Sequence, residues 1–200
     1  MSNWYQSAQK EDDLLQGDII FNFPVLKWKS DMNVQKVRTR SGLNRKYKAN
    51  IEVALEDVIV ITQSCDLANC KTKFLTCCSV FSWEEFKLKL IETGQNEKNC
   101  KKIFNSIRDG FRWNYFLLSS EEVADYGHMD CSMVDFSVVF TVPIQIVKTT
   151  IDLSNSKRLR LKSPYIEHLS QSFARYYMRV GLPTQIQYPE PEKKKPDQRI

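Results

Sequence analysis

Residues 51–61, with the sequence IEVALEDVIVI, constrain the fold of this chain more than any other segment. In the first half, apolar residues alternate with alanine or glutamate, a period of two that is typical of a strand with one exposed face. Residues 58–61 are β-branched throughout, as in strands that are buried on both faces. We therefore predict a central strand that passes from an exposed setting into the core and ends at a polar cluster, residues 63–66.

Further segments predict the other strands of a sheet. They are residues 17–28, 73–81, 111–120, 131–147 and 157–161, with a hairpin over residues 34–48 whose turn lies at 41–44. Pro24 and Pro143 interrupt two of these strands. Because proline cannot donate a hydrogen bond to the ladder, each predicts an edge position or a bulge.

The apolar spacing changes to that of a helix in three places. Residues 82–94 begin with Ser82 and Glu85 at the spacing of a capping box, and residues 96–110 follow as a second helix. The last helix is predicted from Ser163 as N-cap, with Pro164 in its first turn, to Gly181. This order predicts an α+β fold: a small twisted antiparallel sheet or SH3-like barrel, with a helical pair inserted at about 82–110 and a C-terminal capping helix.

The length and composition of the chain limit its number of domains, its location and the state of its cysteines. A chain of 200 residues that is 42% hydrophobic suits one domain, which we place at residues 1–183, followed by a disordered tail at 184–200. The absence of a long apolar run and the polar start of the chain predict a cytoplasmic protein without a membrane partner. The six cysteines contain no C-x-x-C pair, so we expect reduced and mostly buried thiols, no metal site and no cofactor.

The order of several segments resembles that of the MazF/PemK-type toxins, which are small barrels that act on RNA. The segments are LLQGDIIFNF at 14–23, DVIVITQS at 57–64, FLTCCSV at 74–80 and MVDFSVVFTV at 133–142, followed by the helix from Ser163. The chain departs from that family at Glu56 and Asp57, where the family has Arg-Pro, and in its inserted helices. The pattern VITQSCDL at 60–67 also resembles uncharacterised prokaryotic proteins. The toxin resemblance implies an endoribonuclease, although a shared fold alone does not establish shared chemistry.

The candidate catalytic residues are Asp66, Cys65 and Asp135. A side chain at the mouth of a buried strand is held rigidly and is still reachable, as a catalytic group must be. Asp66 would move protons, and Cys65 would act as a nucleophile with His128 or His168 as its base. Asp135 would join the site if it points inward from its strand. The structural alternative is that Asp66 stabilises a turn and Cys65 is buried.

The positive charge of the chain is concentrated in one region. The net charge is +5, and residues 27–48 carry eight lysines and arginines against one aspartate. Cations beside aromatic residues such as Trp28 and Trp113 are typical of surfaces that hold single-stranded nucleic acid. The candidate nucleic-acid-binding residues are Arg38, Arg40, Arg45, Lys46 and Arg112. The alternatives are a solvated charged surface and a non-enzymatic accessory protein that docks on a protein partner through the inserted helices and the tail.

Overall fold

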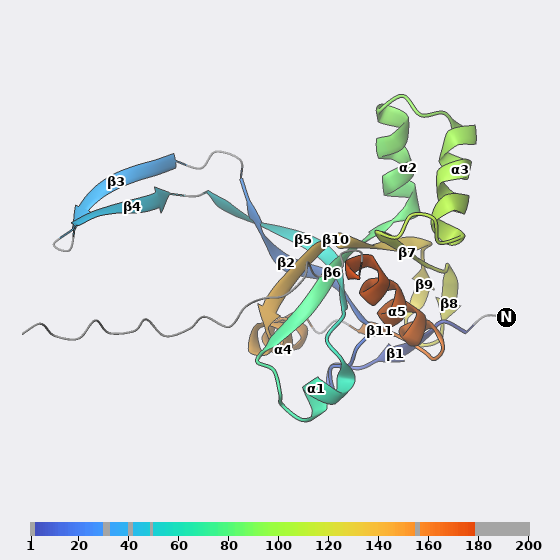
Figure 1. The fold of residues 1–200 in the computed structure, drawn as a ribbon. Coiled ribbons are helices and arrows are strands. Elements are labelled where there is room, and N and C mark those ends of the chain that lie inside the picture. The colour runs from blue at the N-terminus through green and yellow to red at the C-terminus, as the bar shows by residue number, and fades with distance from the viewer. Residues whose placement is uncertain (1–2, 30–32, 40–41, 49, 155–156, 179–200) are drawn as a thin grey trace, which may run out of the picture.

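The computed structural model describes residues 3–29, 33–39, 42–48, 50–154 and 157–178, with only the backbone described in 33–39 and 42–48. The predicted helix end at Gly181 and the predicted tail at 184–200 therefore lie outside the described residues. The chain folds around a seven-stranded sheet in the order β1-β11-β2-β5-β6-β10-β7, and each neighbouring pair is antiparallel (Figure 1). Its strands are β1 (Tyr5–Ala8), β11 (Arg158–Leu161), β2 (Asp18–Trp28), β5 (Ile51–Val60), β6 (Phe74–Ser82), β10 (Ser132–Pro143) and β7 (Tyr115–Leu118).

The fold is α+β, as predicted, and the sheet is open. Its two ends are β1 and β7, and no described strand joins them to close the barrel that was the predicted alternative. A separate two-stranded ribbon, β8 (Glu121–Val123) and β9 (Gly127–Met129), lies beside β1. No helix in the described part of the chain is both long and apolar enough to span a bilayer.

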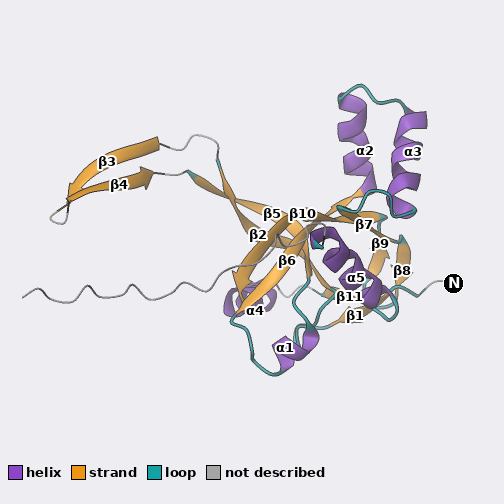
Figure 2. Cartoon of the chain, viewed as in Figure 1, coloured by secondary structure: helices purple, strands orange, loops and turns teal. Residues whose placement is uncertain are grey.

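Helices cover both faces of the sheet (Figure 2). α5 (Tyr165–Tyr177) packs on one face, in a cluster that includes Ile59 and Phe136, while α4 (Ile144–Ser154) packs on the other, in a cluster that includes Val58 and Val60. Successive strand residues point to opposite faces, so the β-branched run of β5 supplies both clusters. The predictions of a strand buried on both faces at 58–61 and of a C-terminal capping helix are confirmed.

The two inserted helices are α2 (Trp83–Glu92) and α3 (Glu97–Arg108). The capping box at the start of α2 is present: the Ser82 hydroxyl accepts a hydrogen bond from the Glu85 N–H at 3.1 Å, and the Glu85 carboxylate accepts one from the Ser82 N–H at 3.2 Å. The rings of Trp83 and Phe104 meet edge to face, with centroids 4.8 Å apart, which joins the two helices. The pair stands away from the sheet (Figure 1).

A two-stranded extension, which we call the arm, leaves the body at residues 24–28 of β2 and 51–55 of β5 (Figure 1). It begins at a bulge, where Asn22 has a φ of 53° and its N–H donates to the Asp57 carboxylate at 2.9 Å. Pro24 follows this bulge, so the bulge predicted there is confirmed. Beyond the arm, β3 (Asn33–Thr39) and β4 (Gly42–Lys48) form the predicted hairpin. The turn predicted at 41–44 is misplaced, because β4 already begins at Gly42, which pairs with Thr39.

Three further local predictions were wrong. Residues 144–147 begin α4 instead of continuing a strand, because Val147 and Ile151 are one helical turn apart and both cover the sheet. The polar cluster at residues 63–66, for which a turn was the structural alternative, leads into a short helix, α1 (Ser64–Ala68). The N-cap of α5 is Pro164 instead of Ser163, and it makes no side-chain capping bond.

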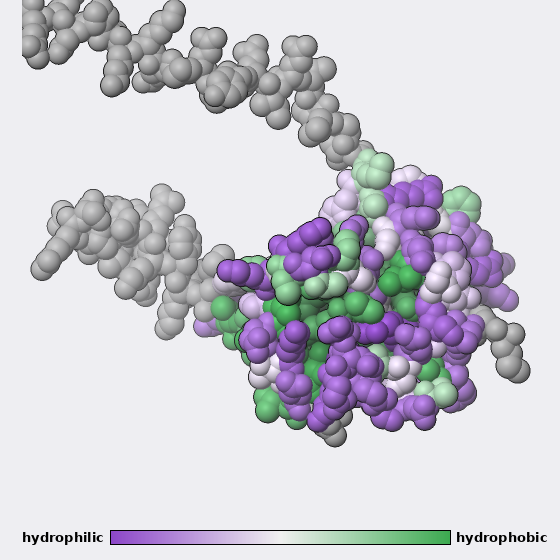
Figure 3. Space-filling model, turned by 90° about the horizontal axis from the view of Figure 1, so that it is seen from below, coloured by the Kyte–Doolittle hydropathy of each residue, from purple (hydrophilic) through white to green (hydrophobic). Residues whose placement is uncertain are grey.

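A buried ion cluster joins β2 to β11. Asp18 is fully buried, and its carboxylate accepts hydrogen bonds from the Arg160 side chain at 2.6 and 3.0 Å. The Arg158 guanidinium, also buried, lies 3.4 Å from the same carboxylate and donates to the Asp12 carbonyl at 2.8 Å. The described surface seen from below in Figure 3 is mainly hydrophilic, with hydrophobic residues near its middle and others at its margins.

Candidate functional site

A polar pocket of about 420 Å³ opens where β5 ends. Its wall combines the end of β5 and the start of α1 with residues of β6 and with one face of α5. Its polar groups come mainly from Gln16, Gln63, Asp66, Thr72, Thr76 and Ser170. Two members of the predicted polar cluster, Gln63 and Asp66, therefore do lie in a pocket.

Hydrogen bonds to Gln16 fix the geometry of this strand end. The Gln16 N–H donates to the Ser64 hydroxyl at 3.1 Å, and the Gln16 side-chain amide donates to the Ile61 carbonyl at 2.8 Å. Asp66 is half-buried, and its carboxylate lies 3.9 Å from the Lys71 ammonium. Asp66 is thus placed to accept hydrogen bonds or a proton from a molecule in the pocket. Among the described residues that line the pocket none is lysine or arginine, so the lining itself offers no cation to a phosphate.

Cys65 is exposed, so the predicted alternative of a buried cysteine is wrong at this position. Its sulfur lies 3.6 Å from the Gln63 side-chain oxygen. Neither histidine serves it as a base in the described structure. His128 lies 2.7 Å from the Glu122 carboxylate and 3.4 Å from that of Asp130, and His168 lines another cavity beside α3. Of the other five cysteines, Cys77, Cys78 and Cys100 are buried, as expected for inert thiols.

Asp135 does not line the pocket of Asp66. It is half-buried at a bulge in β10, where its carboxylate accepts hydrogen bonds from the Ser137 N–H at 2.8 Å and the Ser137 hydroxyl at 2.5 Å. Its partner in the ladder is Ser79, three residues along β6 from the pocket residue Thr76, or about 10 Å. Of the three predicted catalytic residues, Cys65 and Asp66 are therefore neighbours, and Asp135 is not brought together with them.

The predicted basic residues lie on the hairpin beyond the arm. Arg38 is in β3, Arg45 and Lys46 are in β4, and Arg40 lies outside the described residues. The hairpin precedes the first residue of β5, whereas Asp66 follows the last residue of that strand, so the two lie beyond opposite ends of β5 (Figure 2). A ten-residue strand spans about 30 Å, so the basic region and the polar pocket are well separated.

Arg112 lies on the body, in the turn between α3 and β7, and is exposed. The adjacent Trp113 ring is covered by Arg175 of α5, whose guanidinium carbon lies 4.6 Å from the ring centroid. This cation–π contact adds a second arginine to the surface around Arg112. The sequence contains no signal for this contact, because the two residues come from distant segments.

Three features of the molecule could therefore serve a function: a polar pocket without lysine or arginine in its described lining, a distant basic hairpin, and the surface around Trp113 and Arg175. No protein-family model, curated protein or solved structure matches this chain. The resemblance to the MazF/PemK-type toxins stays a prediction.

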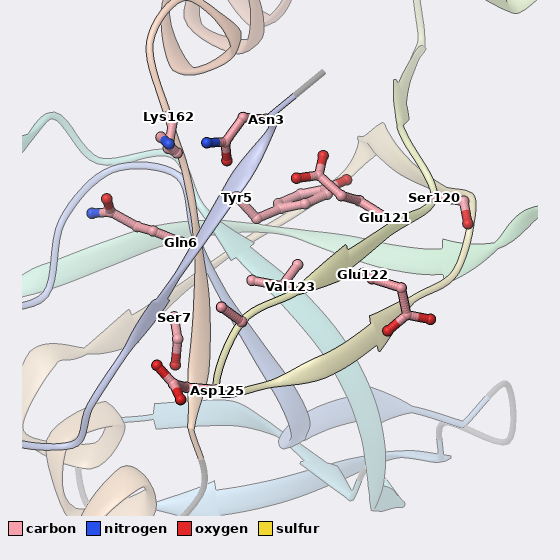
Figure 4. A pocket seen from close by; sticks show the side chains of 11 residues that line it. Asn3, Tyr5, Gln6, Ser7, Ser120, Glu121, Glu122, Val123, Asp125 and Lys162 are labelled. Carbon is pink, nitrogen blue, oxygen red and sulfur yellow. The ribbon is translucent and has the colours of Figure 1, made fainter. Parts of the chain in front are cut away.

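A second cavity, of about 850 Å³, lies between β1 and the ribbon of β8 and β9 (Figure 4). Glu121, Glu122 and Asp125 give it an acidic wall, and Lys162 lies at its opposite side. Burial, and then the charge of Glu121, raise the pKa of the Tyr5 hydroxyl well above its usual value. The acidic residues are visible in the sequence, but their position beside β1 is not. Their negative charge makes this cavity a poor place for a phosphate backbone.

The described residues contain no cluster of histidine, cysteine or carboxylate side chains arranged to hold a metal ion.

Proposed function

We propose that this protein binds nucleic acid through the β3–β4 hairpin at the end of its arm. The observation that carries the proposal is the charge of residues 33–48, which hold six lysines and arginines and no aspartate or glutamate. The backbone of this segment forms an antiparallel hairpin that pairs Lys36 with Arg45 and Arg38 with Leu43. A concentration of cations on one projecting element supports binding to phosphates, which supply most of the affinity of non-specific complexes.

The shape of the element also supports the proposal. A two-stranded β-ribbon is one of the elements that fit the major groove of a duplex, and cationic grooves and ribbons also follow single strands. The hairpin stands out from the body, so it can approach a polymer without bringing the acidic cavity beside β1 close to it (Figure 1). The toxin resemblance favours RNA as the polymer.

The test removes four charges from the hairpin. In the variant Arg38→Ala, Arg40→Ala, Arg45→Ala, Lys46→Ala, we expect affinity for labelled single-stranded RNA at about 0.1 M salt to fall at least ~100-fold. The slope of log affinity against log salt should become less steep by roughly three, since each lost phosphate contact removes about 0.7. Fluorescence anisotropy across a salt series measures both quantities, and a duplex of the same sequence shows which form is preferred.

The matched control removes four charges elsewhere. Lys89, Lys98, Lys101 and Lys102 are exposed on α2 and α3, and their replacement by alanine lowers the net charge equally. We expect this control to bind RNA within about three-fold of the wild type. Equal losses in the two variants would mean that total charge, and not the hairpin, determines binding. Unchanged binding by the hairpin variant would exclude the proposal.

The predicted role of Asp66 requires its own measurement. We expect Asp66→Ala to leave RNA affinity unchanged within about two-fold, because about 30 Å of β5 separate this residue from the hairpin. The same preparations are tested for RNA cleavage, with Asp152→Ala, an exposed aspartate on α4, as control. Cleavage by the wild type and by Asp152→Ala that is lost in Asp66→Ala would add an endoribonuclease activity to the binding function. A loss of affinity in Asp66→Ala would contradict the separation of the two regions.

A further inference from the structure

One face of the arm exposes a continuous row of large apolar side chains. Leu26 and Trp28 of β2 are 68% and 73% exposed, and Ile51, Val53 and Leu55 of β5 are 51%, 63% and 68% exposed. We call these five residues, together with Pro24, the apolar strip. None of them belongs to the two hydrophobic clusters of the body. Single exposed apolar residues are ordinary, but a contiguous group of this size usually marks an interaction surface.

The register of the arm places the whole strip on one face. Pro24 pairs with Leu55, Leu26 with Val53, and Trp28 with Ile51. Residues directly opposite each other in a ladder share a face, as do residues two apart along a strand. The strip is therefore three cross-strand pairs deep, and no charged residue interrupts it.

The opposite face of the arm is polar and already has its partners. The Lys27 ammonium forms an ion pair with the Glu56 carboxylate, and the Lys29 ammonium lies 3.0 Å from the Glu52 carboxylate. This face is therefore suited to water, since its charges are matched within the arm. The two faces of the arm therefore differ: the charges of one face are paired, and the other face is apolar and exposed.

We propose that the apolar strip is covered by the strip of a second copy of this chain, in a two-fold symmetric dimer. In such an interface the same patch meets itself, so the patch must be self-complementary. An uncharged apolar patch meets this condition, because pairing it with itself leaves no buried charge without a partner. The proposal does not depend on nucleic acid, and it gives the dimer two basic hairpins on adjoining arms.

The area of the strip fits a weak dimer. With 150–250 Å² for a tryptophan and roughly 100 Å² for an aliphatic side chain, these exposed fractions correspond to about 400 Å² per copy. Two copies would bury about 800 Å² together, which is in the range of weak, transient interfaces.

Nucleic acid is a poorer occupant of the same face. Bases stack on aromatic rings and phosphates need cations, whereas four of the six side chains of the strip are aliphatic. Contact with a phosphate backbone would leave these aliphatic side chains facing water or the charged phosphates, so they would gain little by being covered. Trp28 alone is suited to stacking.

The test is the oligomeric state of the full chain without nucleic acid, measured by sedimentation velocity from about 1 to about 100 µM, a range that spans typical weak and moderate dimers. We expect the wild type to approach twice its chain mass of 23.4 kDa as concentration rises. The double variant Leu26→Lys, Val53→Lys should stay at the monomer mass throughout, with its dissociation constant raised at least ~100-fold by four lysines in an apolar interface.

The control places the same substitutions on another exposed surface. Ile146 and Leu153 of α4 are 51% and 82% exposed, and Ile146→Lys, Leu153→Lys should dimerise as the wild type does. Circular dichroism verifies that both variants are folded, which is expected because all four side chains are largely exposed. A wild type that remains monomeric, or a strip variant that still dimerises, would overturn the proposal. Dimerisation that appears only when RNA is added would also overturn it.

Discussion

Replacing Asp18 by asparagine is expected to lower the free energy of unfolding by about 3–5 kcal/mol. The substitution keeps the shape of the side chain and removes its charge. Two arginines then lose the carboxylate that faces them, since Arg160 donates to Asp18 at 2.6 Å and Arg158 lies 3.4 Å away. Arg158 is 1% exposed, so water cannot replace the lost charge, and burial already lowers its pKa.

This expected loss in the free energy of unfolding is large because the substitution leaves buried arginines without their partner. It does not mean that the intact ion pairs themselves contribute that much stability. Charges that are removed from water recover little net energy by pairing, but a buried charge that loses its partner keeps the whole desolvation cost. Urea denaturation monitored by circular dichroism measures the change, with Asp13→Asn as control. Asp13 is exposed nearby, and its replacement should alter the free energy of unfolding by less than about 0.5 kcal/mol. Similar values for the two variants would show that the cluster has little role in stability.

Truncating Phe136 to alanine is expected to cost about 3–5 kcal/mol, the usual range for a fully buried phenylalanine. Phe136 is 0% exposed and lies where α5 meets the sheet, with its ring centroid 5.5 Å from that of Phe173. The truncation removes apolar surface and also leaves a cavity under the helix. Because Phe173 also lines the polar pocket, loosening of α5 should disturb that pocket as well.

The control for this truncation is Phe111→Ala, since Phe111 is 77% exposed and loses little buried surface. Its expected cost is below about 0.5 kcal/mol. A double-mutant cycle with Phe173→Ala separates the ring contact, for which about 0.5–1.5 kcal/mol is expected, from the general loss of packing. Additive effects of the two truncations would mean that α5 is held by other contacts.

The elements that the sequence predicts well are those determined by nearby residues. The capping box of Ser82 and Glu85 joins two residues one turn apart, and the buried half of β5 is visible in its own side chains. α4 was missed because its first residues, Ile144 to Val147, include β-branched residues that favour strands, whereas the helix is selected by the face of the sheet that it covers. Tertiary packing outweighed local preference there.

The candidate sites likewise combine features that nearby residues determine with features that only tertiary packing determines. The local sequence pattern predicts that Gln63 and Asp66 stand at the end of a buried strand. It does not predict the pocket that they form with α5, which only the structure shows. In contrast, no local pattern indicates that Arg158 is buried beside Asp18, because the pairing of β11 with β2 joins segments that are distant in the sequence. The contact of Arg175 with Trp113 depends in the same way on how α5 lies.

The position of β11 in the sheet has a consequence for how the chain acquires its structure during synthesis. β11 lies between β1 and β2, and its pairs include Tyr5 with Leu161 and Ile19 with Leu159. The first strand to leave the ribosome therefore has no partner until the chain has been made nearly to the end of the described residues. Until then one edge of β2 is open to other chains, a recognised route to aggregation. Contacts between such distant residues also predict slow folding.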